Sequence, residues 1–199
     1  MYYPLHRALN LSSLKQAFVQ AMQKAWCAQT AWEGLAESYD SKLNPARGQC
    51  LVTVLAAWAD LDFRDRIVPA LARPDSRSPS GEWHFFLNHV RPGFDLNIDP
   101  TVQQYGWSPD VWALERVSLE NALHMEVICG SFFEAKARES LERRLSLFIE
   151  RLESEGGYKL AYSAADILAR VDHVFSYARP TSAQTPAAPV STTSPAAGL

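Results

Sequence analysis

The sequence predicts an α+β fold in which a buried core helix packs on a small antiparallel β-sheet and other helices flank it. Three observations support this class. The run 51–59 is almost wholly apolar, as in a helix that is buried on most sides. Residues 83–99 contain aromatic and alternating segments around a Pro-Gly pair, which is typical of a β-hairpin. Amphipathic segments before and after these predict the flanking helices.

The N-terminal part is predicted to form a helix from residue 11 to about residue 36. Its apolar residues recur at helical spacing: Leu14, Phe18, Met22, Ala25 and Trp26. Ser12 or Ser13 could cap this helix. Residues 37–48 should form a connecting loop, because they include Asn44-Pro45 and Gly48. The core helix then begins between Pro45 and Cys50 and continues to about Leu61.

The central part is predicted to be a loop followed by a hairpin. Residues 72–81 are rich in Pro, Ser and Gly, which indicates an exposed loop. The strands of the hairpin are 83–90 and 94–99, and Arg91-Pro92-Gly93 joins them. Proline followed by glycine suits the central positions of a tight turn.

The C-terminal part is predicted to be helical over 109–119, 132–155 and 164–177. The second of these has the strongest amphipathic pattern, and Gly156-Gly157 should end it. Residues 181–199 contain neither aromatic nor charged residues, so they should remain disordered. We therefore expect a single globular domain over residues 1–180 and a flexible tail.

Composition narrows the possible functions. The net charge of −3 provides no basic field, so a nucleic-acid partner is not expected. There is no apolar run long enough to span a bilayer and no secretory signal pattern, which together predict a soluble cytoplasmic protein with no membrane partner. The three cysteines, at positions 27, 50 and 129, are not closely paired, so we expect free thiols.

Cys50 is the residue for which the sequence most clearly indicates a chemical role. It opens the predicted core helix, and both a helix N-terminus and a neighbouring imidazolium favour a reactive thiolate. Backbone N–H groups at such a helix start could also stabilise an oxyanion. The alternative is that Cys50 is a small apolar residue that only packs in the core.

The hairpin supplies partners for this thiol through strand alternation. If two or four residues form the turn, opposed residues have numbers that sum to 185 or 183, and His84 then shares a face with Asp99. Asp95 and Asn97 share that face, whereas His89 points the other way. A turn of three residues would instead place Asp99 and His84 on opposite faces.

This geometry predicts a catalytic triad in which Cys50 attacks, His84 takes its proton and Asp99 orients the imidazole. Asp95 or Asn97 could replace Asp99, and Gln49 could support the site with its side-chain amide. A metal site is not expected, because strand alternation separates the histidines and no cysteine pair assists them. No cofactor is predicted.

Several of these segments together resemble one family. They are Ala25-Trp26 with Thr30, Asn44 to Cys50 with Thr53, His84 with Asn88, and Asp99-Pro100-Thr101 with Gln104-Tyr105. Over roughly residues 15–150 they look like the YunG-like family of small, uncharacterised bacterial proteins, which has a Gly-Gln-Cys motif. The resemblance implies a papain-like or transglutaminase-like core with Cys, His and Asp in that order.

The chain departs from the family pattern in three places, one of which is a hairpin that looks extended. The spacing from His84 to Asn88 is one residue longer than usual, and Leu61 to Asp65 stands where the family has Gly-Gly after the core helix. The expected function is a cysteine-dependent acyl-transfer enzyme, such as a peptidase, amidase, deamidase or transglutaminase-like protein. Its substrate would carry an amide or acyl bond, for example in a protein or peptide. The alternative is a non-catalytic interaction protein that docks a partner through its C-terminal helices.

Overall fold

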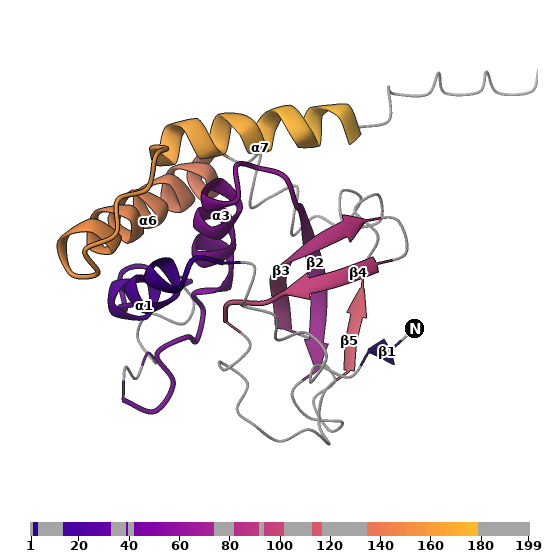
Figure 1. The fold of residues 1–199 in the computed structure, drawn as a ribbon, viewed down its shortest axis with the longest axis horizontal. Helices are drawn as coiled ribbons and strands as arrows, with labels where there is room; N and C mark the ends of the chain where they lie inside the picture. The colour runs from indigo at the N-terminus through magenta and orange to yellow at the C-terminus, as the bar shows by residue number, and fades with distance from the viewer. Residues whose placement is uncertain are drawn as a thin grey trace, which may run out of the picture.

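The computed structural model shows a layer of helices against an antiparallel sheet (Figure 1). It describes residues 2–3, 14–32, 39, 42–73, 82–91, 94–101, 113–116 and 135–178. The helices are α1 (Gln16–Ala25), α3 (Cys50–Asp60), α6 (Ala135–Ser154) and α7 (Ala164–Ala178). The strands are β1 (Tyr2–Tyr3), β2 (Arg66–Arg73), β3 (Glu82–Arg91), β4 (Phe94–Ile98) and β5 (Ala113–Arg116), and their order in the sheet is β1-β5-β2-β3-β4. The α+β class is thus confirmed.

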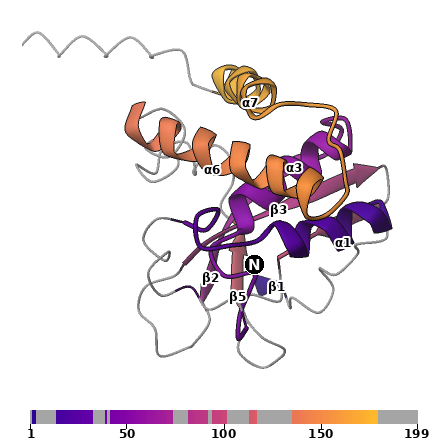
Figure 2. The same ribbon diagram turned by 90° about the vertical axis from the view of Figure 1, so that its left-hand side faces the viewer.

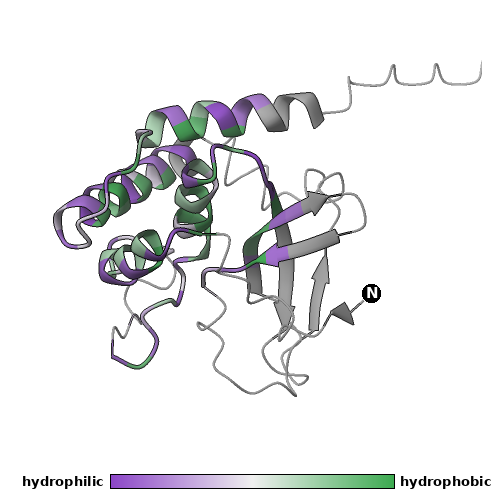
Figure 3. Ribbon diagram, viewed as in Figure 1, coloured by the Kyte–Doolittle hydropathy of each residue, from purple (hydrophilic) through white to green (hydrophobic). Residues whose placement is uncertain are grey.

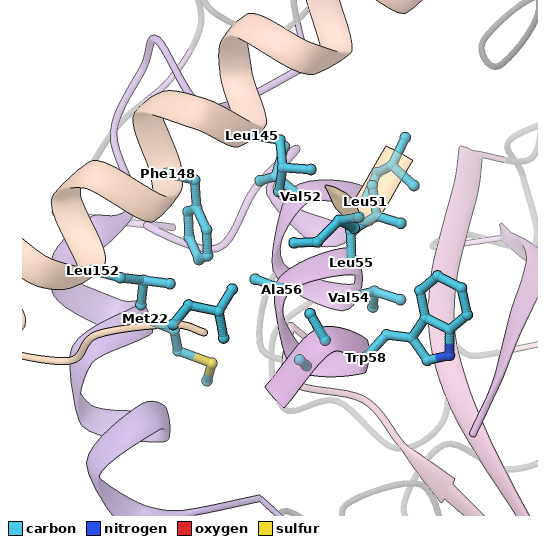
Figure 4. Close-up of a cluster of buried hydrophobic side chains, with 14 of the residues drawn as sticks. Met22, Leu51, Val52, Val54, Leu55, Ala56, Trp58, Leu145, Phe148 and Leu152 are labelled. Atoms are coloured by element: carbon cyan, nitrogen blue, oxygen red, sulfur yellow. The ribbon is translucent and has the colours of Figure 1, made fainter. Parts of the chain in front are cut away.

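Helix α3 is the core helix, and it lies between the sheet and the other helices (Figures 1 and 2). Every residue from Cys50 to Ala59 is buried. On one side, α3 meets Leu145, Phe148 and Leu152 of α6, and on the other side Trp58 extends toward the sheet (Figure 4). Its hydrophobic character along most of its length contrasts with the alternating pattern of α6 and α7 (Figure 3). The absence of a polar face is explained by this burial.

Helix α3 ends in a left-handed turn that has no glycine. Asp62 and Phe63 have φ values of 56° and 58°, a conformation that costs about 1 kcal/mol or more for each residue with a side chain. Packing holds Phe63 in place, because its ring centroid lies 4.7 Å from those of both Trp58 and Tyr162. The Tyr162 hydroxyl donates a hydrogen bond to Asp62 at 2.7 Å. Tertiary contacts therefore support a backbone turn at the position where the resemblance leads one to expect Gly-Gly.

The hairpin of β3 and β4 has the register on which the triad prediction depends. Arg91 pairs with Phe94, Asn88 with Asn97 and Leu87 with Ile98, so the numbers of paired residues sum to 185. Two residues, 92 and 93, separate the paired ends, and they lie outside the described part of the chain. His84 and Asp99 consequently have the parity of one sheet face.

Helix α1 is shorter than the sequence predicts. It ends at Ala25, and Trp26 adopts an extended conformation with φ −66° and ψ 129°. The buried Trp26 indole N–H donates to the Thr53 hydroxyl at 2.9 Å, so a contact with α3 ends the helix although the apolar spacing could continue. At the other end the N-cap residue is Lys15, which makes no side-chain capping bond. Ser12 and Ser13 lie outside the described residues.

The helix predicted for residues 109–119 was wrong over residues 113–116, the part of that range that the structure describes. Residues 113–116 form β5, which pairs with β2 through Ala70 and Arg116, among others. Strand pairing overrides the helical propensity of the short Ala-Leu-Glu-Arg segment. Strand β2 was also missed, and it includes residues 72–73 of the predicted loop. Pro69 and the lack of a clear alternation concealed it.

The other helices agree with the sequence predictions. Helix α6 falls within 132–155, and α7 matches 164–177 to within one residue. The single domain over 1–180 stays a prediction, and the tail 181–199 lies outside the described residues. Within the described ranges, none of the helices combines the length and the apolar character needed to cross a bilayer.

The contact between α1 and the end of α6 provides a stability test. A Cβ atom added to Gly156 would lie 2.5 Å from Ala21 Cβ and 2.6 Å from the Leu152 carbonyl oxygen. We therefore expect Gly156→Ala to lower the free energy of unfolding by about 3 kcal/mol, as measured by urea denaturation. The matched control is Gly157→Ala. Gly157 has φ +68° and open space around it, so this variant should lose only about 1 kcal/mol. Equal losses in the two variants would contradict the close approach of the helices.

Candidate active site

Cys50 lies at the first position of α3, where the chain turns into the helix. Residues 45–48 form the preceding turn, and Gly48 has φ 71°, a left-handed conformation that favours glycine. The Gly48 carbonyl accepts a hydrogen bond from the Trp32 N–H at 2.9 Å, which ties this turn to the segment after α1. Only 8% of Cys50 is exposed. Backbone N–H groups in the first turn of a helix have no intrahelical partner and bring partial positive charge to that end.

His84 and Asp99 form a buried pair beside this helix start. The Nε2 atom of His84 lies 2.6 Å from Oδ2 of Asp99, and the two side chains are 0% and 1% exposed. The second carboxylate oxygen of Asp99 accepts a hydrogen bond from the Thr101 N–H at 3.1 Å. Both oxygens of the carboxylate are therefore engaged, and its orientation is set by the turn that follows β4.

The Cys50 side chain lies close enough to His84 to help raise the pKa of the ring, through a hydrogen-bond interaction and the charge of the thiolate. Nε2 of the ring faces Asp99, so Nδ1 is the ring nitrogen left on the side away from that carboxylate. The Phe86 ring lies near that of His84, with the centroids 6.3 Å apart and a tilt of 30°. The structure thus brings together the three residues that the sequence singled out, in the order Cys50, His84, Asp99.

The electrostatics favour a protonated imidazole. Burial of the ring would on its own lower the pKa of His84, but the charge of Asp99 and hydrogen bonds with Asp99 and Cys50 raise it to about 10. An unperturbed histidine has a pKa of 6.5. The ring is therefore positively charged at neutral pH, next to a thiol at a helix N-terminus.

The Gln49 amide is not available to an oxyanion. Its Oε1 accepts from the Thr30 hydroxyl at 2.8 Å, and its Nε2 donates to the Cys27 carbonyl at 2.7 Å. Burial raises the pKa of the nearby Tyr39 hydroxyl, and the Gln49 amide partly opposes that rise. The expectation that Gln49 supports the site directly with its amide is therefore corrected. Its donors point toward the turn after α1.

Asp95 and Asn97 do not take the place of Asp99. Asn97 pairs with Asn88 and accepts a hydrogen bond from its amide nitrogen at 2.8 Å. The backbone of Asp95 pairs with Val90, six residues along β3 from His84, which corresponds to roughly 20 Å at about 3.3 Å per residue. The alternation of the strand was correct for both residues. Their distance along it excludes them as partners of His84.

A second His-Asp pair lies elsewhere in the sheet. Nδ1 of His89 is 2.5 Å from Oδ1 of Asp65, at the start of β2. The Asp65 carbonyl accepts from the Trp58 indole at 2.8 Å, so this pair anchors the turn after α3. Sequence reasoning placed His89 on the other face from His84, which agrees with its separate partner.

The sequence analysis did not identify two residues that orient side chains of the site. Thr101 orients Asp99, and the spacing of Asp99-Pro100-Thr101 is that of an Asx turn, a signal that could have identified it. Thr30 orients Gln49 from a segment that the sequence assigned to a helix interior. No local pattern indicates that role, because it depends on where α1 ends.

Metal ligands are not clustered in the described part of the chain, where no group of three His, Cys, Asp or Glu residues could hold an ion. Cys27 and Cys50 are free thiols, and Cys129 lies outside the described residues. Comparisons of the whole chain with protein-family models, curated proteins and solved structures found no match.

The pair of His84 and Asp99 should make stability depend on pH. Because the His84 pKa is about 10 in the folded protein and 6.5 when unperturbed, the folded state binds this proton more tightly. The stabilisation should be complete below pH 6.5 and should be lost as the pH rises toward 10. Asp99→Asn should lower the free energy of unfolding by about 3 kcal/mol at pH 6, and the difference from wild type should shrink by pH 10. Urea denaturation of both proteins at several pH values measures it, and a constant difference would contradict the pairing.

Proposed function

We propose that this protein is a cysteine-dependent acyl-transfer enzyme with Cys50 as its nucleophile. The observation that carries the proposal is the continuous chain of contacts from the Cys50 thiol to the His84 ring and on to the Asp99 carboxylate. Its substrate would carry an amide or related acyl bond, as in a peptide or protein. Peptidase, amidase, deamidase and transglutaminase-like reactions all use this chemistry.

The chemical step follows from the positions of the three side chains. The Cys50 thiolate attacks the carbonyl carbon while its former proton resides on His84, and the carbonyl oxygen becomes an oxyanion. Because the Gln49 amide is engaged elsewhere, the N–H groups in the first turn of α3, which have no partner within the helix, would be the donors for that oxyanion. His84 then protonates the leaving amine, and the C–N bond breaks to leave a thioester on Cys50. Water or a second amine resolves the thioester with His84 as the base.

The structure also bears on the resemblance to the YunG-like family, which remains part of the proposal. The residues that carry the resemblance bond to one another across the fold. Trp26 donates to Thr53, Thr30 to Gln49, and Thr101 to Asp99, which in turn holds His84. Motif residues that converge on one site support a shared functional core of papain-like or transglutaminase-like type.

A chromogenic ester tests the proposal without knowledge of the natural substrate. With p-nitrophenyl acetate at pH 7 we expect a burst of p-nitrophenol equal to the protein concentration, and a mass increase of one acetyl group on the peptide that contains Cys50. His84→Ala should slow the burst by about 100-fold or more, because it removes the positively charged partner that holds Cys50 as the attacking thiolate.

The matched control is Cys27→Ala, which removes the other described free thiol and should leave the burst intact. Cys50→Ala should abolish it. Absence of a burst from the folded wild-type protein, or a burst that survives Cys50→Ala, would favour the alternative of a non-catalytic interaction protein.

A further inference from the structure

We propose that Gln49 is a positioning residue that holds the Cys50 thiol in line with His84 by locking the start of α3 to the turn after α1. The inference rests on the proposed function and adds a residue that positions the nucleophile of the same site. It assigns to Gln49 a role in thiol orientation that is distinct from both helix capping and oxyanion binding.

The hydrogen-bond pattern fixes the orientation of the Gln49 amide. A carbonyl oxygen can only accept, so the nitrogen of the amide must face the Cys27 carbonyl, which lies 2.7 Å away. The oxygen then faces the Thr30 hydroxyl at 2.8 Å. The neighbouring Tyr39 hydroxyl donates to the Pro45 carbonyl at 2.9 Å, which ties residue 39 to the turn before α3.

The backbone of Gln49 is held as firmly as its side chain. Its N–H donates to the Ala46 carbonyl at 3.1 Å, and its carbonyl accepts from the Thr53 N–H at 3.0 Å. As the N-cap residue of α3, Gln49 makes no side-chain capping bond. Its polar end is directed away from the helix and fastens the helix to another element.

The turn of residues 27–30, to which the Gln49 side chain binds, is itself held by hydrogen bonds. The Thr30 hydroxyl accepts from the Cys27 N–H at 3.0 Å, which closes the turn, and the Trp26 indole is bonded to Thr53 in the first turns of α3. Gln49 and Thr30 are both completely buried, so water cannot replace a lost partner. A change in either residue should therefore move Cys50 relative to His84, which approaches from the sheet.

The test follows alkylation of Cys50 by iodoacetamide from pH 5 to pH 9, with mass spectrometry of the Cys50 peptide and Cys27 as an internal control. In the wild type the rate should change little between pH 6 and pH 9, because an aligned imidazolium maintains the thiolate. In Gln49→Ala the rate at pH 6 should fall by about 10-fold, while the rate at pH 9 should stay within about 3-fold of wild type, because any thiol ionises there.

Two variants of Thr30 serve as controls for a general folding defect in Gln49→Ala. Thr30→Val keeps the shape of the side chain but removes the hydroxyl that meets Gln49, so it should shift the pH profile in the same direction by a smaller amount. Thr30→Ser retains the hydroxyl and should restore the wild-type profile. A merely structural role would not confine the loss to low pH.

The outcomes of this experiment distinguish the positioning role of Gln49 from the activated nucleophile on which it rests. If the wild-type rate at pH 6 is high and the profiles of Gln49→Ala and Thr30→Val coincide with it, Gln49 has no positioning role although the thiol is activated. If the wild-type profile itself is steep and matches that of a model thiol such as glutathione, the activated nucleophile is absent, and the positioning role is overturned with it.

Discussion

The burial of helix α3 on every side is the constraint on which this structure depends. With no polar face, α3 must be enclosed by the sheet and by α1, α6 and α7, so polar groups gather at its two ends, and those of the candidate site lie at its N-terminal end. Cys50 occupies that end. The hairpin of β3 and β4 packs near the same helix and brings His84 and Asp99 to the thiol. Core packing thus determines where the candidate site is formed.

The polar groups at this end of α3 lose hydration free energy when they are buried, so stability alone does not explain their presence. A charged imidazole and a carboxylate that are both almost completely buried lose their hydration, and such pairs often contribute little net stability compared with apolar residues of the same size. The cost is limited here because each group has a partner, including Thr101 for Asp99 and the Cys27–Thr30 turn for Gln49. A function that needs these groups explains the arrangement better than stability does.

The parts of the fold that the sequence predicted correctly are those set by local periodicity. The apolar run after Cys50 predicted α3, and the alternation around the Pro-Gly pair predicted the hairpin, whose register stayed open between turns of two, three or four residues until the pairing showed a sum of 185. The errors concern long-range contacts. The end of α1 depends on the bond from Trp26 to Thr53, and β5 exists because a neighbouring strand pairs with it. The expectation that the Gln49 amide supports the site directly was wrong because its partners, Thr30 and the Cys27 carbonyl, come from the turn that follows α1.

The most direct test of the central claim is a measurement of the protonation state of His84. In protein labelled with ¹⁵N at histidine, the ring nitrogens of His84 should both carry protons at pH 7.5, and this imidazolium signal should persist until the pH approaches 10. Assignment follows from comparison with the His84→Gln variant. A ring that is neutral at pH 7.5 and titrates near the ordinary value of 6.5 would contradict the coupled arrangement of Cys50, His84 and Asp99.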